Sequence, residues 1–417
     1  MAASRTYGIL WRWHFLAGVI ACPIVFVIAL TGALYTFQPE LDPMVDAQLV
    51  VGPSAQHASV DAMVRAATSR GCTVSGLVLP SARDRAASLY CLEGERRRVL
   101  VDPYRGDVVG ERAAGDTVFE VIFGLHWDLM LGAPGRVLVE WATSCAMLLL
   151  LSGAALWWPR GKRTRGGVWW PRRELRGRQW MRDLHAVAGA YMLPVLFAVT
   201  ASGLMWTLLA GERRWHPLTE DAVHEAWDHP PASTPIAGAS PIGYDAALAA
   251  ARIDRATEPL AVYAQPPLGP TGSYVFLRYD DSSEEAWHAE SIWVDAYRGV
   301  ELKRLGWDDR DAFGQLDSVL YSVHVGSLLG LPGRIAVCLA ALVLAALCVT
   351  GPWMWWKRRP RGKVAAPPRA ERRSWPLGVA IAVLGWLLPT LGVTLVAIVV
   401  VEGAMWLWRS RSAAVSP

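Results

Sequence analysis

Five apolar runs, each near the roughly 20 residues that a helix needs to cross a bilayer, constrain this chain more than any other feature. Backbone N–H and C=O groups in hydrocarbon must bond within their own segment, so these runs are expected to be helices. The expected spans lie at 10–37, within 121–158, at 185–210, within 318–356 and at 375–408. The first run is too long for a cleaved leader and is interpreted as an uncleaved span. Pro389 interrupts the last run, which fits either a kinked helix or a helical hairpin.

Charged residues divide the remaining segments into two kinds. Two short loops, 159–184 and 357–374, are basic, whereas the long polar segments 38–120 and 211–317 carry more acids than bases. The positive-inside rule then places the N-terminus and both loops in the cytoplasm of a bacterial inner-membrane protein, with the polar segments in the periplasm. With 53% hydrophobic and 19% charged residues, the chain fits a mixed architecture of membrane helices and extracytoplasmic domains. The net charge of +4 reflects this topology, so no nucleic-acid partner is expected.

An internal repeat relates the two halves of the sequence. Each half places a histidine 17 residues before a hydroxyl–glycine pair: His14 before Thr31-Gly32, and His185 before Ser202-Gly203. Each half also places a histidine before a Pro-Gly-Arg motif: His126 before Arg136, and His324 before Arg334. We therefore expect a tandem duplication of one unit, which consists of a span, an extracytoplasmic domain and a second span.

Both long polar segments show the same order of predicted elements. A helix at 60–69 precedes strand-like runs at 73–79, 87–92 and 99–102, and the second copy has a helix at 244–251 and runs at 261–265, 273–279 and 291–295. Each set ends in a Val-Asp-x-Tyr-Arg-Gly turn, so each is predicted to be one helix on a small antiparallel sheet. Cys72 and Cys91 can form a disulfide if their strands are neighbours. The other four cysteines lie in spans and are expected to pack as small apolar residues.

These motifs together resemble the PepSY-associated transmembrane proteins, which include bacterial iron-regulated membrane proteins and ferric-siderophore reductases. The resemblance runs from Trp11 to about Trp356. It rests on the motif Arg12-Trp13-His14-Phe15-Leu16-Ala17-Gly18, the two Val-Asp-x-Tyr-Arg-Gly turns, and the His126 and His324 motifs that end in Gly-Arg. The resemblance implies two PepSY-like domains and electron transfer towards a ferric substrate.

Four histidines are the expected ligands of two b-type haems. Each half crosses the membrane twice, so equivalent residues lie at equal depth. His14 and His185 are therefore expected to be the axial ligands of an inner haem, and His126 and His324 those of an outer haem. The small pairs Thr31-Gly32 and Ser202-Gly203 lie about 26 Å beyond His14 and His185, at the outer depth, and are expected to leave room for the macrocycle. Ser152 and Thr350 are expected to face the inner haem.

Each of these assignments has a plainer alternative. A histidine near a span end can be an interfacial residue, and small-glycine pairs can serve helix packing alone. A zinc site is disfavoured because its three or four ligands would have to converge on one point. Four arginines are candidate partners of haem propionates: Arg136 and Arg334 on the outer side, and Arg12 and Arg182 on the inner side, where the positive-inside bias explains them equally well. The group formed by His216, His224 and His229 is interpreted as a solvated loop rather than an iron site.

The main functional hypothesis is a membrane ferric reductase. No G-x-G-x-x-G motif follows a predicted strand, so the electrons are expected from an unidentified cytoplasmic or quinol donor. The expected partner is a ferric siderophore or another ferric chelate in the periplasm, and no catalytic residue beyond the haem is required. One alternative is a membrane-anchored PepSY protein that binds peptide or regulates a peptidase. Another is a siderophore or iron permease, which is disfavoured because the spans show almost no ionisable residue near the midplane, apart from Glu140 and Glu402 near span ends.

Overall fold

The computed structural model describes residues 2–93, 97–113, 115–159, 166–215, 221–280, 289–359 and 375–396. The chain divides into two compact units, and each unit combines segments that are distant in sequence. The membrane unit contains Met1–Ala33, Gly124–Pro217 and Ala336–Pro417, and the sheet unit contains Leu34–Phe123 and Leu218–Ile335. Each sequence repeat therefore contributes its apolar runs to one unit and most of its polar segment to the other.

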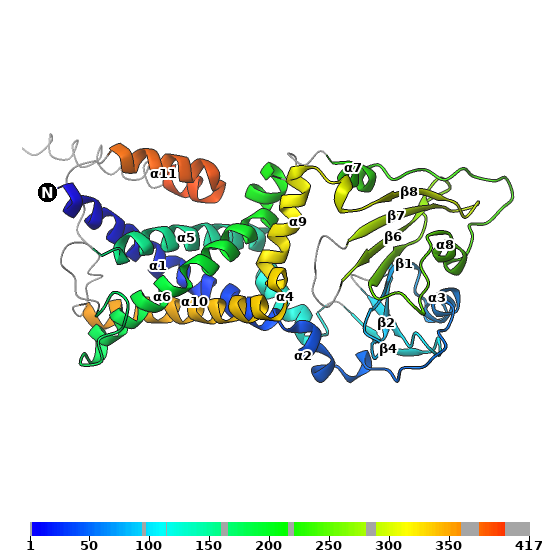
Figure 1. Cartoon of the computed structure of the whole chain (residues 1–417), viewed down its shortest axis with the longest axis horizontal. Coiled ribbons are helices and arrows are strands. Elements are labelled where there is room, and N and C mark those ends of the chain that lie inside the picture. Colours follow the sequence, from blue (N-terminus) through cyan, green and yellow to red (C-terminus); the bar gives the residue numbers. More distant parts are fainter. Residues whose placement is uncertain are drawn as a thin grey trace, which may run out of the picture. The chain divides into compact units, whose positions relative to one another are not determined.

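The described chain contains four helices that are long and apolar enough to cross a membrane (Figure 1). They are α1 (Ala2–Tyr35), α5 (Ala133–Trp157), α6 (Gly177–Gly203) and α10 (Gly330–Arg358). They account for the first four expected spans, although α6 already begins at Gly177 instead of 185. Small buried residues such as Ala21, Ala142 and Ala146 lie in the core between the helices, as expected where close packing drives association in lipid. The protein is thus membrane-embedded.

The segment after residue 374 is not one long helix within its described part. α11 (Trp375–Leu387) ends before Leu388, and the chain is helical again over 389–396. A Cβ on Gly385 would lie 3.1 Å from the Cα of Gly392, whereas residues seven apart in a continuous helix are separated by about 10 Å along the axis. The chain therefore reverses at Leu388 as a helical hairpin. The expected single span over 375–408 is not found in this part, and residues 397–408 lie outside the described residues.

The sheet unit is built on one antiparallel sheet of eight strands in the order β4-β3-β2-β1-β5-β6-β7-β8. The strands are β1 (Val74–Leu79), β2 (Ala87–Cys91), β3 (Arg98–Val101), β4 (Val108–Arg112), β5 (Ala261–Gln265), β6 (Ser273–Tyr279), β7 (Glu290–Asp295) and β8 (Glu301–Leu305). All six expected strands are present, and a fourth strand follows each Tyr-Arg-Gly turn. β1 pairs with β5, with Leu77 opposite Ala264. The two expected small sheets are therefore halves of one continuous sheet.

Helices α3 (Val60–Thr68) and α8 (Tyr244–Ala250) cover the same face of this sheet (Figure 1). Their buried side chains, including Met63 and Leu248, pack with strand residues such as Leu89 and Phe276 in one core. Burial alternates along β2, the period-two pattern of a strand with one face in a core. The remaining elements are α2 (Gln38–Val45), α4 (Val118–Trp127), α7 (Ala222–Asp228) and α9 (Ala312–Val325), with 3₁₀ turns at Ala47–Leu49, Leu204–Trp206, Trp307–Asp309 and Ser327–Leu329 and a π-helical segment at Leu208–Trp215.

The first turns of α3 and α8 are joined by a reciprocal pair of aspartates. Asp245 accepts hydrogen bonds from the N–H groups of Val60 (2.8 Å) and Asp61 (3.1 Å). Asp61 accepts from the N–H groups of Tyr244 (2.7 Å) and Asp245 (3.3 Å). Each carboxyl thus satisfies N–H groups at the start of the other helix, which have no partner within their own helix.

The two Asp-x-Tyr-Arg-Gly turns have the same structural role. In the first, the Asp102 carboxylate accepts from the N–H of Tyr104 at 2.8 Å, and in the second Asp295 accepts from the N–H of Tyr297 at 2.8 Å. Gly106 and Gly299 follow with φ of +77° and +60°, a conformation that side-chain-bearing residues rarely adopt. The motif therefore builds the turn that leads into the last strand of each half.

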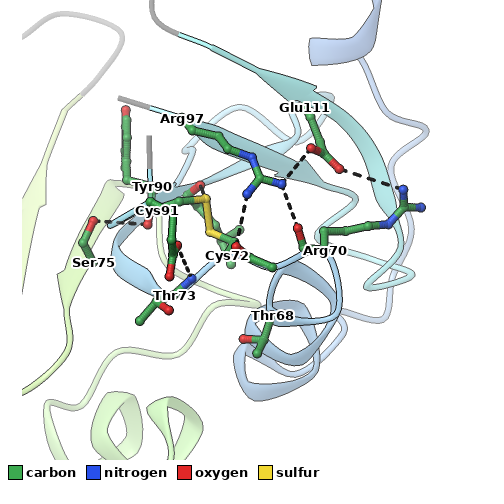
Figure 2. Close-up of a disulfide and its surroundings, with 12 residues drawn as sticks. Thr68, Arg70, Cys72, Thr73, Ser75, Tyr90, Cys91, Arg97 and Glu111 are labelled. Atoms are coloured by element: carbon green, nitrogen blue, oxygen red, sulfur yellow. Dashed lines mark hydrogen bonds and ion pairs between the residues drawn. A yellow bond between two sulfur atoms is a disulfide. The ribbon is translucent and has the colours of Figure 1, made fainter. Parts of the chain in front are cut away.

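Cys72 and Cys91 form a disulfide (Figure 2). The sequence allowed this bond only if the two strands were neighbours, and β1 does pair with β2. The disulfide joins Cys72, which follows the turn after α3, to Cys91, the last residue of β2. Arg97 lies beside it and donates to the carbonyls of Gly71 (3.1 Å) and Arg70 (2.7 Å) and to Glu111 (2.9 Å). The disulfide and the Arg97 bonds together attach the end of α3 to the sheet.

Candidate functional site

Three of the four expected haem ligands lie in the membrane unit, each on a different helix. His14 is on α1, His126 is near the end of α4, and His185 is on α6, and all three are partly buried. The pairing of His14 with His185 as ligands of one haem stays a prediction from the sequence repeat. His324 lies on α9 in the sheet unit. The pairing of His126 with His324 therefore stays a prediction from the sequence repeat.

The imidazole of His14 is held by α5. Its Nδ1 lies 2.9 Å from the hydroxyl of Ser152, and that hydroxyl donates to the carbonyl of Leu148 at 2.6 Å. Since the hydroxyl proton is used in this second bond, the imidazole donates from Nδ1 and its lone pair is on Nε2. The next residue on α5 is Gly153, where a Cβ would lie 3.2 Å from Cε1 of His14. The glycine thus lets the ring lie against the helix backbone.

His185 is held by α10 in the same way. Its Nδ1 lies 2.8 Å from the hydroxyl of Thr350, which donates to the carbonyl of Leu347 at 3.3 Å. A Cβ on Gly351 would lie 3.6 Å from Cε1 of His185. A hydroxyl followed by glycine therefore holds both members of the expected inner pair.

His126 uses the hydroxyl–glycine pair on α1. Its Nδ1 lies 2.9 Å from the carbonyl oxygen of Ile28 and 3.3 Å from the hydroxyl of Thr31. A carbonyl can only accept, so the proton is on Nδ1 and the lone pair is on Nε2. A Cβ on Gly32 would lie 2.9 Å from Cε1 of His126, closer than a Cβ contact normally allows. The ring position therefore requires glycine at residue 32.

This arrangement fits axial ligation of haem iron. A metal-bound histidine commonly donates its other ring N–H to an oxygen, which fixes the tautomer and the orientation of the ring. All three imidazoles have Nδ1 engaged in this way, which leaves the Nε2 lone pair available for a metal ion. Within the part of the chain that the structure describes, no group of three or more His, Cys, Asp or Glu side chains is placed to hold a metal ion. Pairs of imidazoles suit haem because the porphyrin supplies the other ligands.

The structure gives the small residues a contact that the sequence expectation did not name. Thr31 and Gly32 contact the imidazole of His126, and the space they were expected to leave for a macrocycle stays a prediction. Ser202 and Gly203 end α6, and the buried Ser202 hydroxyl donates to the carbonyl of Ala198 at 2.8 Å, the same backbone bond that Thr31 makes to Val27 at 2.7 Å. The missed signal was chemical, because each hydroxyl can bind an imidazole nitrogen and each glycine leaves space for its ring.

The outer arginines have glutamate partners within the protein. Arg136 pairs with Glu212 and lies over the ring of Trp127, with Cζ 4.7 Å from the centroid. Arg334 bonds Glu40 at 2.7 and 2.6 Å, and this hydrogen bonding lowers the pKa of Glu40. The sequence expectation named the arginines but not these acids. Their role beside haem propionates stays a prediction.

Arg182 and His224 each contact an aspartate of the protein. Arg182 bonds Asp183 at 2.8 Å, and Arg12 lies on α1 two residues before His14. In the sheet unit, Nδ1 of His224 lies 3.0 Å from Asp221, the residue that caps α7. His229 ends that helix, and His216 lies outside the described residues. The structure therefore gives His224 a structural contact.

Comparison with known proteins identifies one family. The chain matches the family described as "PepSY-associated TM region" over residues 11–358. This match covers most of the first described span, the other three spans completely and the whole eight-stranded sheet. No curated protein matches the chain.

Proposed function

The chain belongs to the family of PepSY-associated transmembrane proteins, and from this premise we propose that it is a haem-binding electron-transfer protein that reduces a ferric chelate. The observation that carries the proposal is the way the histidines are held. Three imidazoles of the membrane unit have Nδ1 bonded to oxygen atoms of a neighbouring helix, which leaves the lone pair on Nε2. An interfacial histidine needs no glycine beneath its ring, whereas a glycine follows the contacted hydroxyl residue at each of these three rings.

In this proposal His14 and His185 would hold an inner b-type haem. His126 and His324 would hold an outer one, an assignment that rests on the repeat in the sequence. When bound, haem supplies one-electron transfer. The contribution of the chain itself is to fix the ligand tautomers through Ser152, Thr350 and the Ile28 carbonyl, and to enclose the rings between helices.

The proposed substrate is a ferric siderophore or another ferric chelate on the periplasmic side of the bacterial inner membrane. Such chelators hold the hard Fe(III) ion more tightly than Fe(II), so one electron is enough to release the metal. The basic segments 159–184 and 357–374 support a cytoplasmic location for the loops. The Cys72–Cys91 disulfide supports an oxidising compartment for the sheet unit. The electrons come from a cytoplasmic or quinol donor.

The test is the visible spectrum of the purified full-length protein, oxidised and dithionite-reduced, with pyridine-haemochrome quantification. We expect low-spin b-type bands at about two haems per chain. Each of the variants His14→Ala, His185→Ala, His126→Ala and His324→Ala should lose about one haem, and a double variant within one pair should lose no more than either single variant.

His57→Ala is the matched control, because His57 lies in the sheet unit against Tyr104, with ring centroids 4.8 Å apart. It should retain the wild-type haem content. If the wild-type protein from haem-replete cells is colourless, the redox proposal is wrong, and a peptide-binding role of the sheet unit becomes the next hypothesis. With haem present, reduction of ferric siderophores by the dithionite-reduced protein tests the substrate.

A further inference from the structure

Glu140 on α5 is a fully buried acid inside a membrane-spanning helix. Its Oε2 accepts hydrogen bonds from the N–H groups of Leu209 (2.7 Å) and Ala210 (3.4 Å). Its Oε1 is also buried, and it has no hydrogen-bond partner among the described residues. A buried carboxylate oxygen without a donor is costly, whereas the N–H groups on the other oxygen favour the charged form. The charged form of Glu140 therefore leaves Oε1 without a donor, and the neutral form weakens the bonds that Oε2 accepts.

The charged groups around Glu140 do not form an ion pair with it in the described part of the chain. Arg136, one turn earlier on α5, pairs with Glu212. Arg214 lies over the ring of Trp386, with Cζ 4.1 Å from the centroid, and Arg213 is its neighbour in the π-helical segment. The hairpin over 375–396, which bonds α5 through Thr390 and Thr394, contains no ionisable side chain.

The repeat does not require an acid at this position. The offset that relates His126 to His324 relates Glu140 to Cys338, a residue without charge at neutral pH. Glu140 caps the π-helical segment Leu208–Trp215. π-Helical turns are rare in proteins, and those that occur are often at functional sites. The second span of the other half is built without such an acid.

Glu140 lies near the expected outer redox site. It is one helical turn from Arg136, and the Arg136 guanidinium lies over Trp127, the residue next to His126. These contacts all belong to the membrane unit. A charge added at His126 is therefore expected to act on Glu140 through a medium of low dielectric constant.

We propose that Glu140 binds a proton reversibly on Oε1 and takes it up when an electron is added to the site of His126. The proposal rests on the proposed function for the electron. The added electron brings one negative charge, and conversion of the Glu140 carboxylate to the neutral acid cancels it. When the electron passes to the ferric substrate, the carboxyl releases the proton, so a full cycle consumes no net proton. Glu140 thereby makes the outer site easier to reduce.

Infrared difference spectroscopy of the full-length protein tests proton binding without haem. The C=O stretch of a protonated carboxyl is separate from carboxylate and amide bands. We expect wild type to gain such a band as the pH is lowered, Glu140→Gln to lack it, and Cys338→Ser, the matched change at the repeat counterpart, to keep it. Identical pH-difference spectra for wild type and Glu140→Gln would overturn the proposal.

Redox titration of the haem-loaded protein then tests the coupling. The midpoint potential of one haem should fall as pH rises, by about 59 mV for each tenfold difference in proton affinity between the oxidised and reduced forms. Glu140→Gln should remove this dependence, and Cys338→Ser should retain it. Haem bands with a pH dependence that Glu140→Gln leaves unchanged would overturn the coupling and leave the proposed function intact. A colourless protein would instead refute the proposed function, while the infrared test would still decide whether Glu140 binds a proton.

Discussion

A hydroxyl followed by a glycine is the residue-scale motif on which the proposed site depends. It occurs at Ser152-Gly153, Thr350-Gly351 and Thr31-Gly32, and each copy holds one imidazole of another helix. The hydroxyl binds Nδ1, and the missing side chain lets the ring approach the backbone. This explains why the sequence pairs a small polar residue with glycine inside membrane helices, where glycine otherwise lowers helix propensity.

A methyl group at residue 32 tests this motif. In Gly32→Ala the new Cβ would lie 2.9 Å from Cε1 of His126, so the ring must move away from the Ile28 carbonyl. We expect the variant to lose about one of the two proposed haems, measured as pyridine haemochrome per protein. Gly18→Ala is the control on the same helix, because its Cβ would make an ordinary contact of 3.6 Å with Leu149. Full haem content in Gly32→Ala would contradict the role assigned to the glycine.

At the scale of elements, α3 and α8 meet through two carboxyls whose pKa values are shifted in opposite directions. Burial and the hydrogen bond to Asp245 raise the pKa of Asp61. Burial alone would raise the pKa of Asp245 as well, but the N–H groups of Asp61 and Val60 outweigh it, and the pKa is lowered. The protonated Asp61 and the ionised Asp245 therefore form the favoured pair. Its stabilisation is lost as pH rises through the raised pKa of Asp61 or falls through the lowered pKa of Asp245.

Two asparagine variants separate these roles. Asp61→Asn resembles protonated Asp61, so we expect it to remove the loss of stability that wild type shows as pH rises through the raised pKa of Asp61. Asp245→Asn removes the charged acceptor of two N–H groups and should cost about 1 kcal/mol. Thermal unfolding of the full-length protein over a pH series, followed by near-ultraviolet circular dichroism, measures both. Equal effects of the two variants at all pH values would rule out the unequal pair.

At the scale of the whole molecule, both halves of the sequence contribute to one sheet. The pairing of β1 with β5 places two central strands side by side, where a free edge would otherwise expose unpaired N–H and C=O groups. The core under α3 and α8 is also shared by both halves. The halves of the sheet unit are therefore expected to unfold together.

A proline in β5 tests this cooperativity. Ala264 is fully buried and lies opposite both Leu77 of β1 and Phe276 of β6. In Ala264→Pro, the lost ladder bond and the unsatisfied partner should cost about 3 kcal/mol, which lowers the unfolding midpoint by about 6–12 °C. Hydrogen exchange should increase in both halves of the sheet at once. Leu268→Pro, in the exposed loop after β5, is the control and should change neither. Faster exchange confined to 261–305 would show that the halves unfold separately.

Local patterns were sufficient for much of the fold. The apolar runs predicted five spans, four of which are spanning helices in the described chain, and sequence patterns predicted six of the eight strands. These features depend on residues that are near in sequence, where side-chain periodicity and backbone hydrogen bonding decide the structure. The conformation of the last apolar run could not be predicted, because Pro389 permits either a kinked helix or a hairpin. The close approach of Gly385 to Gly392 in the structure identifies the hairpin.

The sequence by itself therefore determined the four described spanning helices, six of the eight strands and the two helices that cover the sheet. Only the tertiary structure decided that Ser152 holds His14, that Thr350 holds His185 and that Thr31 holds His126, pairs separated by 138, 165 and 95 residues. It likewise decided that β1 meets β5 in one sheet and that Glu140 is buried with one oxygen unpaired among the described residues. The physical reason is that packing selects among many hydroxyls, edges and helix ends that are equivalent in a one-dimensional pattern.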